Sequence, residues 1–218
     1  MFSNTRKILG AMLTHENSLF TPTEAAVLTR LPVKAVNNAI DRKTVASTSG
    51  NRAGHVTRLL DLHALISLTL ERRLADRFTP ELRREVFDAL AGTSSDTVSL
   101  DGGFLKIDLR EPRRELAVSL RTLRRARQIV SSDPDVLGGE PVFRGTRVQV
   151  HLIAKLLRQG STQAELLEAY PRLTAEMIGI ALVYADAYPL RGRPRKQPWH
   201  DQPPVHRARR KLAAITMA

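Results

Sequence analysis

The side chains best suited to specific chemistry lie on one expected helix near the amino terminus. A helix that begins at Pro32 carries apolar residues at positions i, i+3 and i+7, which are Val33, Val36 and Ile40. Its outer face consists of polar residues: Lys34, Asn37, Asn38, Asp41 and Arg42. Asparagine can pair with the edge of adenine, and lysine with guanine or phosphate. This face therefore suits the major groove of DNA, although the spacing alone leaves a solvated helix surface as an equal alternative.

Other residues that could do chemistry do not form a catalytic or metal site. The histidines show no metal-ligand spacing; they are His15, His55, His63, His151, His200 and His206. Gly138-Gly139 lacks the GxGxxG continuation and the following lysine of a phosphate-binding loop. Asp133 and Asp135 lie beside a proline turn without a third acid that would suggest a metal site. We therefore expect no enzyme, no metal and no cofactor.

Composition indicates a polyanionic partner. The chain has 218 residues, 42% of them hydrophobic, which suits one large or two small folded domains. Its net charge is +12, typical of proteins that bind nucleic acid or an acidic protein. Cysteine is absent, so disulfides and thiolate metal sites are excluded. The apolar runs are shorter than the ~20 residues of a membrane span, and no signal-peptide core precedes them, so we expect a cytoplasmic protein without a membrane partner.

The elements around the polar helix predict a helix-turn-helix domain over residues 1–91. Thr21-Pro22-Thr23-Glu24 has the pattern of a capping box, and the helix that it starts runs to about Thr29 before a tight turn at Arg30-Leu31. Strands over 45–48 and 56–60 bracket a hairpin tip at 49–54, which presents Arg52 as the wing of a winged helix does. Helices over 61–77 and 80–91 complete the domain.

Residues 92–130 are expected to connect this domain to the rest of the chain. A polar linker is followed by a hairpin that turns at Asp101-Gly102-Gly103, and then by a helix over 112–129. The helix buries Leu116, Leu120 and Leu123 and carries six arginines elsewhere. Those arginines either bind phosphate or form a solvated, partly paired face.

The segment 135–150 is the most distinctive stretch of the sequence, and we expect it to be extended and hinged by glycine. Gly138 and Gly139 permit positive φ, Pro141 holds the preceding residue extended, and Gly145 redirects the chain before the alternating Val148 and Val150. Short helices then follow at about 152–157, 161–170 and 174–188.

This order resembles a module of bacterial type II antitoxins, in which a GGxPVFRGTRVxV-like segment precedes three homeodomain-like helices. The resemblance covers residues 131–188. The matching positions are Gly138, Gly139, Pro141, Val142, Arg144, Gly145, Thr146 and Arg147. The amino-terminal half resembles the DNA-binding domain of VapB-type antitoxins. The resemblance implies an antitoxin that represses its own operon and neutralises a PIN-like ribonuclease toxin with an acidic, Mg²⁺-dependent site.

The fold that we expect is mainly α with small β hairpins: a winged-helix-like amino-terminal domain and a three-helix, homeodomain-like carboxyl-terminal domain. The last helix of the second domain has no lysine or arginine but carries Glu176 and Asp186, so phosphates would repel it. We therefore assign operator DNA to the first domain, through Lys34, Asn37, Asn38, Arg42 and Arg52. A homodimer is expected, since such repressors match a two-fold operator.

The tail over residues 189–218 is expected to be disordered alone and to bind the toxin. It has eight Lys or Arg against Asp201, a charge of 8 − 1 = +7. The toxin-binding candidates are Arg191, Arg193, Arg195, Lys196, Trp199, Leu212 and Ile215. A minor-groove hook and a plain solubilising tail remain the alternatives for this segment. For the whole chain, the alternatives are a stand-alone winged-helix regulator and an architectural DNA-binding protein.

Overall fold

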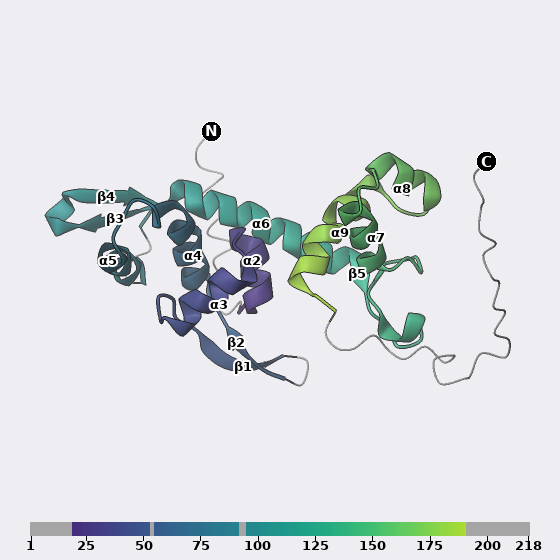
Figure 1. The fold of residues 1–218 in the computed structure, drawn as a ribbon, viewed down its shortest axis with the longest axis horizontal. Helices are drawn as coiled ribbons and strands as arrows, with labels where there is room; N and C mark the ends of the chain where they lie inside the picture. Colours follow the sequence, from purple (N-terminus) through teal and green to yellow (C-terminus); the bar gives the residue numbers. More distant parts are fainter. Residues whose placement is uncertain (1–18, 53–54, 92–94, 191–218) are drawn as a thin grey trace, which may run out of the picture.

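A computed structural model describes residues 19–52, 55–91 and 95–190, which are organised along one long helix. This helix, α6 (Arg110–Ile129), has 20 residues and is therefore about 30 Å long. Figure 1 shows α2 to α5 along its amino-terminal part and α7 to α9 around its other end. The expectation of a mainly helical chain with small antiparallel hairpins is confirmed.

The first two helices form as their capping residues predict. In α2 (Pro22–Thr29) the Thr21 hydroxyl accepts a hydrogen bond from the Glu24 backbone at 3.3 Å, and the Glu24 carboxylate accepts one from the Thr21 backbone at 2.9 Å. The helix ends at Arg30, whose φ of 56° is left-handed and turns the chain sharply. After two further residues α3 (Val33–Asp41) begins, so the pair is joined by a tight turn.

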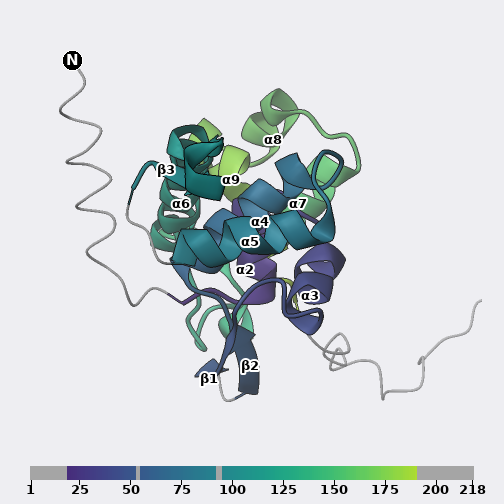
Figure 2. The same ribbon diagram turned by 90° about the vertical axis from the view of Figure 1, so that its left-hand side faces the viewer.

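The first hairpin differs from its expected bounds. Strands β1 (Thr48–Arg52) and β2 (His55–Leu59) pair antiparallel with Arg52 opposite His55, so the expected strands at 45–48 and 56–60 and the six-residue tip were wrong. Arg52 is a strand residue. Backbone pairing outweighs the low strand propensity of the segment 49–51, and Gly50 fits closely because an added Cβ would lie 2.4 Å from Leu59 Cδ1. Figure 2 shows this hairpin projecting from the side of α2 and α3.

Two helices and a second hairpin complete the amino-terminal half. They are α4 (Leu62–Leu74), α5 (Pro80–Ala91), β3 (Thr97–Leu100) and β4 (Leu105–Asp108). The Asp61 carboxylate caps α4 by accepting from the Ala64 backbone at 2.8 Å. The expected turn between the strands is confirmed, with a 3₁₀ turn over Asp101–Gly103.

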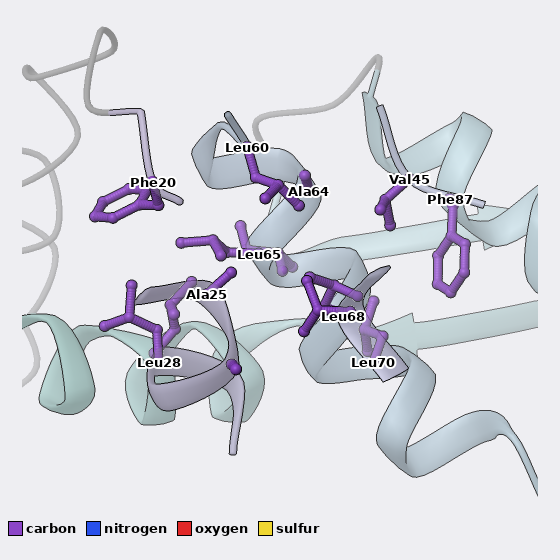
Figure 3. Close-up of a cluster of buried hydrophobic side chains, with 14 of the residues drawn as sticks. Phe20, Ala25, Leu28, Val45, Leu60, Ala64, Leu65, Leu68, Leu70 and Phe87 are labelled. Atoms are coloured by element: carbon purple, nitrogen blue, oxygen red, sulfur yellow. The ribbon is translucent and has the colours of Figure 1, made fainter. Parts of the chain in front are cut away.

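The core of this half extends past residue 91. Its buried side chains include Phe20, Leu28, Leu65, Leu68 and Phe87, which Figure 3 shows converging between the helices. The same cluster contains Leu116, Leu120 and Leu123 of α6 and Ala187 near the carboxyl end of the described chain. The boundary that we expected at residue 91 therefore does not coincide with an edge of the packed core.

A second core forms around the other end of α6. Short strands β5 (Val130–Ser131) and β6 (Val142–Phe143) pair antiparallel, and the helices that follow are α7 (Val150–Arg158), α8 (Gln163–Ala169) and α9 (Ala175–Ala187). Phe143, Ile153 and Ile178 are among its fully buried side chains. Thr162 and Thr174 cap α8 and α9.

The glycine-hinged segment is extended only in part, as at β6, Glu140 and Gln149, and it turns at its glycines. Gly138, Gly139 and Gly145 have φ values of 67°, 85° and 78°, which confirms that they are needed where the chain turns. Leu137–Gly139 forms a 3₁₀ turn, which extended backbone would not allow. The expected strand at Val150 was wrong, because Val150 begins α7 and is buried with Ile153 and Ala154 at helical spacing.

Candidate nucleic-acid interface

The outer face of α3 is polar and accessible. Val36 and Ile40 are buried in the first core, whereas Lys34, Asn38 and Arg42 are exposed. Val33, which we expected on the inner face, is 38% exposed, because the first turn of α3 projects beyond the core. Arg52 of the hairpin is exposed as well, so four of the five expected DNA contacts lie on a surface that a nucleic acid can reach.

Arg58 of β2 links the hairpin to α3. Its guanidinium donates to Asn37 Oδ1 at 2.8 Å and forms an ion pair with Asp41. A bidentate contact from Asn37 to adenine needs both amide groups, and one of them is engaged here. Asn37 and Asp41 therefore orient the hairpin, while Asn38 keeps its amide accessible. No local pattern indicated a role for Arg58, because its partners lie 17 and 21 residues away in the sequence.

Arg52 lies at the distal end of the same hairpin. Its side chain is exposed and donates to the Leu19 backbone carbonyl at 2.7 Å, so the end of β1 is held to the segment that precedes α2. A guanidinium that donates to a carbonyl still has other N–H groups for a phosphate.

Charge is distributed differently over α3 and α6. The stretch from Leu31 to Leu59 holds five Lys or Arg and one Asp, a net 5 − 1 = +4. Among the described residues Lys34, Arg42 and Lys43 have no acidic partner. Five of the seven arginines of α6 are instead paired with carboxylates, as Arg113 is with Asp96 and Arg125 with Glu176, and only Arg121 and Arg124 lack an ion pair among the described residues. Available positive charge is what phosphate attracts, so α3 is the better candidate.

A buried polar cluster fixes α2, and with it α3, against the rest of the chain. Glu24 is 2% exposed, and its carboxylate accepts from the Arg127 guanidinium of α6 at 2.7 Å. Arg127 also donates to the Tyr188 hydroxyl, with its guanidinium 5.8 Å from the ring centroid. Burial alone would lower the pKa of Arg127, because it disfavours the charged guanidinium, but the interactions with Tyr188 and Glu24 raise that pKa overall. Burial raises the pKa of Tyr188, so the phenol stays neutral.

The second helix pair offers less to DNA. The acids of α9 are each paired with an arginine, Glu176 with Arg125 and Asp186 with Arg158, so the helix has no net positive charge to offer. In the preceding loop Arg144 donates to the Gln128 carbonyl at 3.0 Å, and Arg147 is exposed. The expected toxin-binding residues of the tail, from Arg191 to Ile215, lie outside the described residues.

The part of the chain that the structure describes contains no group of three or more His, Asp or Glu arranged to hold a metal ion. Within those same residues no helix combines the length and the apolar character that crossing a bilayer requires.

These features define a mostly helical protein in which an amino-terminal helix pair with an attached hairpin is joined through α6 to a glycine-hinged helical module. Residues 130–185 match the family described as "Protein of unknown function (DUF433)". Over 186 residues the chain is 38% identical to "Uncharacterized protein y4eO" of Sinorhizobium fredii (strain NBRC 101917 / NGR234), a match that covers 79% of this chain and 82% of that relative. The chain therefore belongs to the same family as y4eO.

The crystal structure of Rv2018 from Mycobacterium tuberculosis also aligns with this chain. It is 18% identical, and the alignment covers 75% of this chain and 96% of that one with a TM-score of 0.32. A score at that level supports no argument from one fold to the other.

Proposed function

We propose that this protein binds specific DNA through a winged helix-turn-helix formed by α2, α3 and the β1–β2 hairpin. The observation that carries the proposal is the combination of unpaired basic residues on the outer face of α3 with a hairpin held to that helix by Arg58. Lys34, Arg42 and Arg52 supply phosphate contacts, and Asn38 supplies the base contact.

The same protein acts as the antitoxin of a type II toxin-antitoxin pair and represses its own operon. Support comes from the resemblance of residues 131–188 to an antitoxin module, with α7 to α9 as its homeodomain-like helices, and from the positive charge of the tail. The partner is a PIN-like ribonuclease, and arginines of the tail pair with the carboxylates of its Mg²⁺ site. A homodimer places two copies of α3 on a two-fold operator.

Two measurements on the full chain test this proposal. Footprinting on the DNA upstream of its own reading frame should show a protected site. The protein should also co-purify with the nuclease from the adjoining reading frame, and the complex should cleave RNA more slowly than the nuclease alone. Specific DNA binding without nuclease suppression would instead identify a stand-alone regulator. Equal affinity for all DNA sequences would identify an architectural protein, and a lack of DNA binding would overturn the proposal.

A further inference from the structure

Leu137 has an unusual combination of backbone strain and exposure. Its φ is 49°, in the left-handed region that a bulky side chain rarely adopts, although glycines follow it at 138 and 139. The side chain is 48% exposed, so only about half of it packs against the rest of the fold. The turn is nevertheless held by backbone hydrogen bonds from Val136 to Asp133 at 2.9 Å and from Gly139 to Val136 at 3.0 Å. The fold thus holds a large apolar group outward at a cost in stability.

An open pocket of about 550 Å³ lies beside this turn. Val136 and Val142 contribute apolar lining, and Arg147 and Arg172 contribute positive charge from two separate segments. The two guanidinium groups are exposed and have no acidic partner among the described residues. Asp133, which also lines the pocket, forms no ion pair with either arginine.

Most residues of the glycine-hinged motif have a structural explanation, but Arg147 does not. The Thr146 hydroxyl donates to the Phe143 carbonyl at 2.9 Å and accepts from the Val148 backbone at 3.0 Å, which closes the turn. Arg144 is bonded to the backbone of α6, and Gly145 has positive φ. Arg147 contributes no such contact, so the fold alone does not account for an arginine there.

We propose that this turn and pocket form a docking surface for the protein partner, in which Leu137 inserts into an apolar depression of the partner while Arg147 and Arg172 pair with one of its carboxylates. The inference rests on the proposed antitoxin function and assigns the nuclease a contact on the folded module in addition to the tail. Arginine beside an exposed apolar anchor is typical of protein interfaces, and its planar guanidinium binds carboxylate bidentately.

The charge of this surface favours a protein over DNA. Both views show the loop on the same side of the molecule as the β1–β2 hairpin, so DNA is the competing ligand. However, the loop carries Asp133, Asp135 and Glu140 against Arg144 and Arg147, and with Arg172 the surface is neutral. A phosphate backbone needs a net positive surface, whereas a protein surface with charges of both signs and an apolar depression complements this one.

The test uses the full chain and the purified nuclease from the adjoining reading frame, with affinity measured by calorimetry. Replacing Leu137 with Gly relieves the backbone strain, so the melting temperature should stay the same or rise while nuclease affinity falls at least tenfold. Arg147→Ala and Arg172→Ala should each weaken binding by a similar factor. Matched controls are Leu152→Ala, another exposed leucine, and Arg121→Ala, another exposed arginine, and both should bind as wild type.

Each other outcome has a distinct meaning. If the wild-type chain does not bind the nuclease, the antitoxin function fails and this surface loses its partner with it. If wild type binds but the Leu137, Arg147 and Arg172 variants bind equally well, the docking surface alone is overturned. Reduced DNA affinity with unchanged nuclease affinity would make the pocket a phosphate site, and loss of self-association in sedimentation would make it a contact between two copies of this chain. Both results would refute the proposal.

Discussion

Arg127→Met tests how the buried cluster holds α2 in place. Glu24 is 2% exposed, and both of its carboxylate oxygens are occupied: one accepts from the Thr21 backbone at 2.9 Å and the other from Arg127 at 2.7 Å. Methionine retains an apolar stem but removes the charge, so the buried Glu24 carboxylate loses its cationic partner and keeps only the Thr21 backbone and the Tyr188 hydroxyl. The resulting decrease in the free energy of unfolding measures the contribution of the contact between α2 and α6.

The expected cost lies between the known limits for ion pairs. Removing one partner of a fully buried pair costs about 3–5 kcal/mol, and an exposed pair contributes about 0–1 kcal/mol. Glu24 is buried but the Arg127 side chain is 40% exposed, so solvent screens part of the interaction and we expect about 2 kcal/mol. For a protein of this size that corresponds to a fall in melting temperature of roughly 4–8 °C.

The assay is urea and thermal unfolding of Arg127→Met and of a control variant, Arg125→Met. Arg125→Met is the matched control, because its ion pair with Glu176 is exposed to solvent on both sides and its loss should hardly change the free energy of unfolding. The double variant Glu24→Gln/Arg127→Met should be more stable than Arg127→Met alone, since no buried charge remains unpaired. Equal stability of Arg127→Met and Arg125→Met would refute the reasoning.

Four further outcomes follow from the structure. Arg58→Met should lower DNA affinity about tenfold while leaving the melting temperature within a few degrees, because it frees the hairpin from α3; unchanged affinity would separate the hairpin from DNA binding. A fragment ending at Ala91 should fail to unfold cooperatively, since it lacks the α6 leucines of the first core, and a sharp transition would contradict this. Burial alone would raise the pKa of Glu115, but hydrogen bonds from Arg73 and Arg72 lower that pKa overall, so the ionised carboxylate stabilises the fold above pH 4.5 and this stabilisation is lost as the pH falls further. Glu115→Gln should therefore show a shallower acid transition than wild type, and an equally steep transition would count against the pairing of Glu115 with Arg72 and Arg73. A chain ending at Leu190 should keep operator binding and lose nuclease neutralisation, and the reverse result would favour a minor-groove hook.

Local signals predicted the local structure well. The cap residues Thr21, Asp61, Thr162 and Thr174 mark helix starts because a side-chain oxygen and a backbone N–H only a few residues apart satisfy each other. The glycines of the hinge have positive φ for the same kind of local reason. Two valines at alternate positions were too little to distinguish a strand from the first turn of α7, where burial of Val150 decided the outcome.

Long-range pairs were beyond such signals. Glu24 reads in the sequence as a capping residue, and nothing near it indicates Arg127, 103 residues away. The link from Arg58 to α3 depends on the register of the hairpin, which the polar segment 48–52 does not specify. The strain at Leu137 could not be foreseen, because the adjacent glycines were sufficient to explain a turn. The polar face of α3 could therefore be predicted from the sequence, whereas the long-range contacts that hold α2, α3 and the hairpin in place could not.

The central claim is that unpaired basic residues of α3 bind DNA, and its most direct test is the salt dependence of affinity. The full chain and its Lys34→Ala and Arg121→Ala variants would be titrated with DNA from upstream of the reading frame, at several salt concentrations. Because each phosphate contact releases about one counterion, Lys34→Ala should reduce the slope of log affinity against log salt by about 1, and Arg121→Ala should leave it unchanged. A slope unchanged in Lys34→Ala, or reduced in Arg121→Ala, would place the DNA contact elsewhere and contradict the account.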